Sequence, residues 1–176
     1  MQLTIKNTIS IVDTLKICIA KRINFAVYKL PGKEGMTLII QKDPEINQLG
    51  DISEKLPGKG FLIAPFVRES ENTYLIRPDY ILYDEVTPRQ LEEIEALHGF
   101  PCNDVQMSYP DDTLKDDYFK LIGKALTKIN NGEFEKVVLS RVKSIKGAYS
   151  SRLPDIYDIL CSTYKTAFVY LYCLHG

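Results

Sequence analysis

The sequence predicts an α+β fold in which a largely antiparallel sheet is flanked by helices. Between residues 24 and 83, short stretches rich in β-branched and aromatic residues follow one another, separated by proline and glycine. This pattern is typical of antiparallel strands. Helical periodicity marks other segments before and after them. The expected order is a helix, a group of antiparallel strands, two helices, and then strand, helix and strand. Because most strands are grouped and do not alternate regularly with helices, this order is typical of an α+β fold.

The first elements are a helix and a hairpin. Residues 8–21 carry isoleucine, valine and leucine at helical spacing, with Thr8 as a possible cap. Residues 24–30 and 36–41 predict two strands, and the proline and glycines of residues 31–35 predict the turn between them.

A long polar connection, residues 42–59, follows the hairpin. Residues 60–66 then predict a buried strand. Two short strands are expected at residues 74–77 and 80–83, separated by Pro78, which cannot donate a ladder hydrogen bond.

Two helices are expected in the middle of the chain. The first starts with Thr87 as cap, followed by Pro88 and by Gln90 in a capping box, and Gly99 can close it. The second is the longest, residues 113–131. It opens with another capping-box pattern at Thr113 and stops at Gly132.

The last elements are a strand at residues 135–142, a helix at 153–164 and a strongly apolar strand at 167–174. Such a strand is normally covered on both faces, and the sequence ends directly after it. We therefore expect a fragment, with an N-terminal sheet-and-helix portion, residues 1–110, and the start of a catalytic portion, residues 111–176.

Composition limits the class of protein. The 176 residues are 45% hydrophobic and 26% charged, with a net charge of −1, so no basic surface favours nucleic acid or an anionic membrane as partner. No signal peptide or membrane span is expected, and the predicted location is the cytoplasm. Four cysteines show no metal-ligand spacing and read as reduced thiols. They are Cys18, Cys102, Cys161 and Cys173.

Lys136 is the candidate catalytic residue. In an alternating strand its side chain shares a face with those of Val138, Ser140 and Val142. If that face lines a cavity, loss of solvation lowers the pKa of a lysine and makes it a neutral amine base. A solvated lysine that protects a strand edge is the more common alternative on spacing alone.

Other polar groups have simpler explanations. The aspartates at 111–112 and 116–117 lie near a helix start, where acids are favourable, and His98 lies at a helix end, where a cation is favourable. No phosphate-binding glycine loop or nucleophile elbow is present in the sequence.

Residues 129–141 have the sequence Ile-Asn-Asn-Gly-Glu-Phe-Glu-Lys-Val-Val-Leu-Ser-Arg. This sequence resembles the helix-to-strand segment of chorismate-utilising enzymes, specifically isochorismate synthases. Residues 60–66 are similar to an earlier strand of these enzymes. The resemblance runs from Phe25 onward and covers only the N-terminal part of a family member. It implies a partial chorismate-utilising fold, of the aminodeoxychorismate synthase type.

The resemblance implies a reaction. In this family lysine at the Lys136 position goes with water as nucleophile, and glutamine with the amination enzymes. Lys136 would take a proton from water as it attacks C2 of chorismate, the C4 hydroxyl would leave, and isochorismate would form with Mg²⁺. The general acid and the Mg²⁺ ligands of the family lie in its C-terminal part, so no residue here matches them; Glu133 and Glu135 are not those ligands.

Several outcomes stay open. The complete protein would be an isomerase of menaquinone or siderophore biosynthesis, with this fragment inactive. A salicylate synthase of the same family is the first alternative. The second is a noncatalytic module that binds or assembles, including self-association through an exposed sheet.

Overall fold

The computed structural model describes residues 8–45, 47–49, 58–65, 73–100, 112–145 and 149–174. Helices occur beside antiparallel sheets, which confirms the α+β class. In order, the elements are β1 (Ile9–Ser10), α1 (Ile11–Lys21), β2 (Phe25–Lys29), β3 (Met36–Ile40), β4 (Asn47–Leu49), β5 (Phe61–Ile63), β6 (Thr73–Ile76), β7 (Tyr80–Tyr83), β8 (Glu85–Val86), α2 (Pro88–Glu95), α3 (Lys115–Asn130), the 3₁₀ turn η1 (Ser150–Arg152), α4 (Leu153–Thr163) and β9 (Val169–Cys173).

The chain forms two compact units. The first comprises Met1–Cys102 together with Ala148–Gly176, and the second comprises Asn103–Gly147. The last helix and strand, which the sequence assigned to residues 111–176, therefore belong with the N-terminal sheet. The reason is strand pairing, because β9 is hydrogen-bonded to β2 along its whole length.

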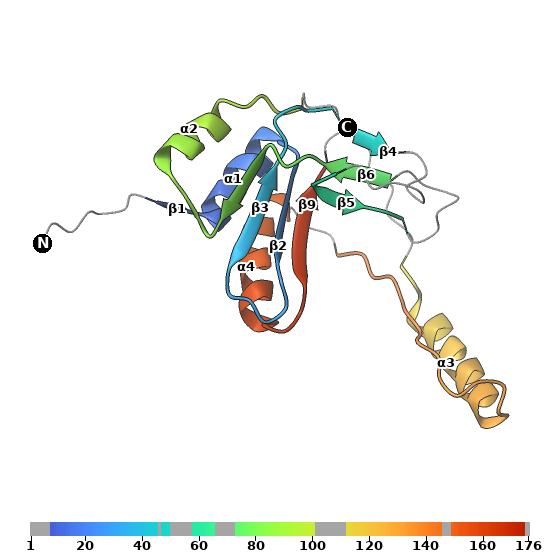
Figure 1. Cartoon of the computed structure of the whole chain (residues 1–176). Coiled ribbons are helices and arrows are strands. Elements are labelled where there is room, and N and C mark those ends of the chain that lie inside the picture. The colour runs from blue at the N-terminus through green and yellow to red at the C-terminus, as the bar shows by residue number, and fades with distance from the viewer. Residues whose placement is uncertain are drawn as a thin grey trace, which may run out of the picture. The chain divides into compact units, whose positions relative to one another are not determined.

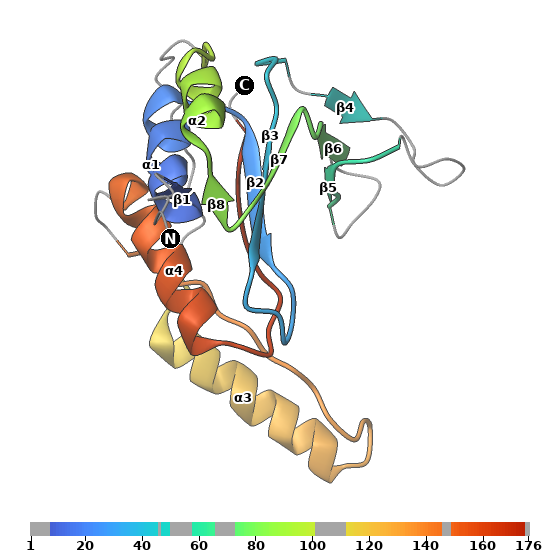
Figure 2. The same ribbon diagram turned by 60° about the vertical axis from the view of Figure 1, so that its left-hand side comes forward.

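The first unit is built on a six-stranded sheet with the order β1-β8-β7-β3-β2-β9. Helices α1, α2 and α4 lie against one face of this sheet (Figure 2), and the small sheet β4-β6-β5 lies on the other side. The hairpin of β2 and β3 forms as predicted, with Phe25 opposite Ile40 and Lys29 opposite Met36. Figure 1 shows the hairpin at the centre of the unit.

Strand β2 separates two cores because successive side chains point to opposite faces. Phe25 and Val27 are fully buried in the larger core, beneath the helices. Ala26 and Tyr28 contact the smaller core, which includes Ile76 of β6. The larger core also contains Ile11, Leu15, Cys18, Ile23, Leu38, Ile40, Leu82, Val86, Ile94, Tyr157, Cys161 and Val169.

Helix α1 starts later than predicted. Its N-cap is Ser10, whose hydroxyl oxygen accepts a hydrogen bond from the backbone N–H of Asp13 at 3.1 Å. Thr8 is therefore not the cap. Ser10 is the cap instead, because Ile9 and Ser10 pair with β8 and hold the chain extended up to the first helical residue.

Helix α2 has the predicted capping box between Thr87 and Gln90, with Pro88 in its first turn. Its end differs from the prediction, because the C-cap is Ala96 and not Gly99. Gly99 has a different role: a Cβ atom at that position would collide with the backbone carbonyl of Lys21. The absence of a side chain lets the segment after α2 lie directly against the end of α1.

The strands on either side of Pro78 form as predicted, but they belong to different sheets: β6 pairs with β4 and β5, and β7 pairs with β3 and β8. Two-residue strands β1 and β8 were not predicted, since two residues carry no periodicity. Among the helices described, none has the length and apolar character needed to cross a membrane.

Strand β9 is not covered equally on its two faces, although so apolar a strand is normally covered on both. Val169 is buried against the larger core, whereas Tyr170 and Tyr172 are 54% and 41% exposed. On the exposed face these rings lie near Phe61 of β5, at centroid distances of 6.2 and 6.3 Å. The tyrosines allow this arrangement because their rings pack while their hydroxyl groups reach water.

Candidate functional site

Helix α3 ends as the sequence predicts. Gly132 has a positive φ of 75°, its N–H donates to the carbonyl of Ile129, and the N–H of Glu133 donates to the carbonyl of Lys128. These two bonds form a Schellman motif, in which glycine is favoured because it has no Cβ to clash. The chain therefore turns sharply just before the segment that carries Lys136.

The start of α3 differs from the prediction. The N-cap is Leu114, without a side-chain cap, so the predicted Thr113 capping box does not form. Instead, the Thr113 hydroxyl oxygen accepts a hydrogen bond from the N–H of Val142 at 3.1 Å, and the Thr113 N–H donates to the Val142 carbonyl at 3.0 Å. The segment that follows α3 thus returns to the beginning of the helix.

The predicted strand at residues 135–142 does not form; these residues have no regular secondary structure. Helix α3 is the only helix or strand among the described residues of this unit. A strand requires a neighbouring strand to pair with its N–H and C=O groups, and none of the described residues of the unit supplies one. The β-branched composition of residues 135–142 is therefore not sufficient to form a strand.

Lys136 lies on this segment with its side chain exposed, as do Ser140 and Val138, the last with 93% exposure. The described residues leave Lys136 exposed and do not enclose a cavity around it. Arg141 is closer to the helix, with its guanidinium 5.9 Å from the ring centroid of Tyr118.

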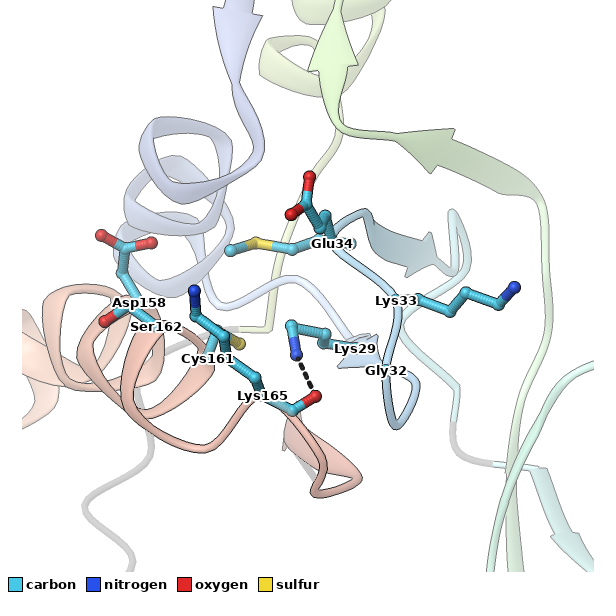
Figure 3. Close-up of a pocket in the computed structure, with 9 residues that line it drawn as sticks. Lys29, Gly32, Lys33, Glu34, Asp158, Cys161, Ser162 and Lys165 are labelled. Carbon is cyan, nitrogen blue, oxygen red and sulfur yellow. Dashed lines mark hydrogen bonds between the residues drawn. The ribbon is translucent and has the colours of Figure 1, made fainter.

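A pocket of about 320 Å³ lies in the first unit, between the turn of the β2–β3 hairpin and the end of α4. Figure 3 shows the side chains that surround it. Charged and thiol groups are prominent among the lining residues, which are Lys29, Gly32, Lys33, Glu34, Met36, Asp158, Cys161, Ser162 and Lys165.

Lys29 is the most unusual of these residues because it is only 4% exposed. Its Nζ donates a hydrogen bond to the backbone carbonyl of Lys165 at 3.2 Å. The same carbonyl accepts a bond from the N–H of Gly32 at 2.9 Å, so the connection between α4 and β9 is fixed to the hairpin turn. The Lys165 carbonyl thus joins Lys29 and the hairpin turn at the wall of the pocket.

Cys161 lies near Lys29 in the pocket, and both Cys161 and its neighbour Tyr157 are buried. Burial raises the pKa of the Cys161 thiol, while a hydrogen bond with Tyr157 and the charge of Lys29 act in the opposite direction. Burial also raises the pKa of the Tyr157 hydroxyl. The hydroxyl oxygen of Tyr157 is inaccessible to solvent and has no N or O hydrogen-bond partner among the described residues; the Cys161 sulfur is its neighbour. Cys161 is therefore held as a thiol and is not an activated nucleophile.

Lys29 was not predicted as a site residue, although the sequence carries a signal for its burial. In the predicted strand, alternate residues point to the same face, so the side chain of Lys29 shares a face with the core residues Phe25 and Val27. A lysine on the core-facing side of a strand either reaches solvent at the end of the strand or is buried. The alternation of residues alone does not distinguish these two outcomes.

The residues described do not include a cluster of three or more His, Cys, Asp or Glu side chains that could hold a metal ion. The aspartates near the start of α3 have other partners. Asp117 pairs with Lys120 at 3.0 Å, and Asp112 accepts a hydrogen bond from the N–H of Ser144. His98 is exposed just beyond α2, while His175, Cys102 and Asp111 lie outside the described residues. None of the described side chains is therefore assigned to Mg²⁺, whose ligands the resemblance places outside this chain.

Comparison with known proteins found no match: no family model, no curated protein and no solved structure is similar to this chain at a significant level.

Proposed function

We propose that this sequence is the N-terminal part of an isochorismate synthase and that Lys136 is the base for the attack of water on chorismate. The proposal is carried by one observation: α3 ends in a Schellman motif at Gly132, and an exposed β-branched segment with Lys136 follows. The helix and its glycine stop agree with the helix-to-strand segment that the resemblance of residues 129–141 implies, whereas the strand itself does not form in the described structure.

The proposed reaction moves a hydroxyl group. Lys136, as a neutral amine, takes a proton from water while the water oxygen forms a bond to C2 of chorismate. The ring double bonds shift, the bond between C4 and its hydroxyl group breaks, and that hydroxyl leaves with a proton from an acid. The acid that gives this proton and the ligands of Mg²⁺ are proposed to lie outside this chain.

Because Lys136 is exposed in this chain, the proposed reaction needs further residues around it. A lysine becomes a neutral base when burial disfavours its charged form. Other residues must therefore cover the segment in the active protein. The segment is suited to being covered, because Val137, Val138 and Val142 are all more than 40% exposed and their burial would be favourable.

The test is an assay of the complete protein with chorismate and Mg²⁺, with isochorismate separated by chromatography. Lys136→Ala is expected to lower kcat/KM by about 10²- to 10⁴-fold, the usual contribution of a general base. Lys143→Ala is the matched control, because Lys143 is an exposed lysine on the same segment; it is expected to retain activity within about twofold.

The assay also separates the alternatives. Near-normal turnover by Lys136→Ala would remove this residue from the chemistry. Release of pyruvate together with salicylate would favour a salicylate synthase, in which the same residue activates water. Failure of the complete protein to convert chorismate, with Lys136 intact, would contradict the enzyme assignment itself.

A noncatalytic module is the second candidate, and the exposed apolar side chains of α3 favour it. Leu121 and Leu126 are 45% and 54% exposed, and Leu114 is 67% exposed. Such a surface is a site of association if it stays uncovered in the complete protein. Concentration-dependent sedimentation of the complete protein, without any conversion of chorismate, would support this role.

A further inference from the structure

The pocket beside the β2–β3 turn contains a buried ammonium group that has fewer partners than donors. The ammonium group of Lys29 has three N–H donors. Among the described residues, its Nζ donates one hydrogen bond, to the Lys165 carbonyl. Glu34 and Asp158 line the same pocket, yet no ion pair joins either of them to Lys29 in the described part of the chain. A buried charge is strongly unfavourable unless it is paired.

The fold leaves Lys29 little freedom to avoid burial. It pairs with Met36 on one side and Val169 on the other, in the middle of three hydrogen-bonded strands. It lies on the face of β2 that carries Phe25 and Val27 into the larger core. An apolar residue would pack at this position without a charge penalty, so the ammonium group calls for a function.

The surroundings of Lys29 favour a negative partner. The pocket is lined by three lysines and two carboxylates, which leaves an excess of one positive charge. Figure 3 shows Lys29 and Lys165 beside Cys161, whereas the side chains of Lys33 and Glu34 extend away from Lys29. Cys161 contributes no negative charge, because burial raises the pKa of its thiol.

We propose that this pocket binds a small oxyanion, a carboxylate or phosphate group, through the Nζ of Lys29. The remainder of the ligand lies against the side chain of Met36, which is packed on the core. The volume of about 320 Å³ is at the small end of the range for ligand pockets, so the ligand is a metabolite and not a polymer. This site is separate from Lys136, and the inference does not rest on the function proposed for that residue.

The 176-residue chain is the protein to test. Thermal unfolding and calorimetric titration are measured with inorganic phosphate and with benzoate, against chloride at the same ionic strength. A saturable rise in Tm with one of the two anions is expected, because a ligand that binds the folded state stabilises it. Phosphate and benzoate distinguish a phosphorylated ligand from an aromatic carboxylate.

Variants assign the binding to the pocket. Lys29→Met keeps the length of the side chain and removes the charge; it is expected to weaken binding by about 10- to 100-fold, the usual effect of losing a hydrogen bond to a charged group. Lys124→Met removes an exposed lysine that does not line the pocket; it is the control and is expected to bind within about twofold of the parent. Without anion, Lys29→Met is expected to unfold at a higher temperature, because an incompletely paired buried charge has been removed.

A second measurement keeps the inference testable if Lys29→Met does not fold. Alkylation of Cys161 in the parent chain, followed by peptide mass spectrometry, is expected to slow when the anion is bound, while alkylation of Cys173 is unchanged. Absence of any saturable anion effect overturns the proposal. Retention of full affinity by Lys29→Met, or equal protection of both cysteines, overturns it as well.

Discussion

Helices α1 and α3 have similar apolar patterns but differ in what covers them. The stripe of α1, with Ile11, Leu15 and Cys18, is at most 1% exposed. On α3, Leu121 and Leu126 are about half exposed, and Ala125 is the one buried residue. Helix α1 packs against α4 and the sheet, whereas α3 has no other helix or strand in the described part of its unit. Periodicity thus predicts which face of a helix is suited to burial, but not what buries it.

The same difference separates two apolar extended segments. Strand β9 and residues 135–142 are both predicted strands, yet only β9 forms, because β2 provides its hydrogen-bond partners over Phe25 to Lys29. Residues 135–142 have no partner strand in the described part of the second unit. Backbone groups without a ladder remain irregular and hydrated, which is the state in which Lys136 is found.

The largest expected effect is on the free energy of unfolding of the 176-residue chain. Leu15→Ala is expected to destabilise by about 2–5 kcal/mol, because Leu15 is completely buried. Leu126→Ala is the matched variant on α3 and is expected to change the free energy by less than about 0.5 kcal/mol. Urea titration followed by circular dichroism measures both. An equal cost for the two variants would mean that the apolar stripe of α3 is covered in solution, as that of α1 is.

Two glycines are expected to respond with opposite signs. Gly99→Ala is expected to destabilise the first unit by about 1–3 kcal/mol, because the new Cβ would meet the Lys21 carbonyl and the end of α1 would have to shift. Gly123→Ala lies within α3 with nothing within 4 Å of the new Cβ, and is expected to stabilise that helix by about 0.8–1 kcal/mol.

Thermal unfolding measures the Gly99 variant, and the helical signal of the chain measures the Gly123 variant. Destabilisation by Gly123→Ala would show that this position packs closely against another part of the protein. An unchanged Tm for Gly99→Ala would show that the contact between the ends of α1 and α2 is not tight.

The smallest expected effect concerns pH. Hydrogen bonds from Lys16 and then from Ser10 hold the pKa of Asp13 below its usual value. A lowered pKa in the folded state contributes stability that is present above the ordinary pKa of about 4, and that is lost as the pH falls through the lowered value. Both side chains of the Lys16 pair are about half exposed, so the contribution is expected to stay below about 1 kcal/mol.

Asp13→Asn is therefore expected to reduce the loss of Tm between pH 5 and pH 3 by a small amount. Asp117→Asn is the control in α3, where Asp117 makes a pair of the same spacing with Lys120, and global unfolding should not respond to it. Equal responses of the two variants would indicate that the effect is one of net charge and not of the α1 start.

Local chemistry made much of the fold predictable. The hairpin followed from two β-rich stretches around a turn, the start of α2 from Thr87 and Gln90, and the end of α3 from Gly132. Each depends on residues only a few positions apart, whose hydrogen bonds form within the segment itself. The predicted Thr113 cap failed because Val142, distant in sequence, donates to its hydroxyl.

The candidate sites depended on longer-range contacts. Lys136 was selected from its sequence, but its exposure follows from the absence of a neighbouring strand in the described part of its unit. Lys29 was missed, although its phase with Val27 was visible, because its burial depends on α4 and on the connection from α4 to β9. These residues are more than a hundred positions away along the chain.

Local propensity and periodicity were enough to predict the α+β class, most helices and strands, and the faces of those elements that are suited to burial. Three further features were visible only in the folded chain: β9 completes the sheet beside β2, Pro78 separates strands of two sheets, and Lys29 is enclosed while Lys136 is exposed. Burial and strand pairing require two surfaces, and a pattern along one segment describes only one of them.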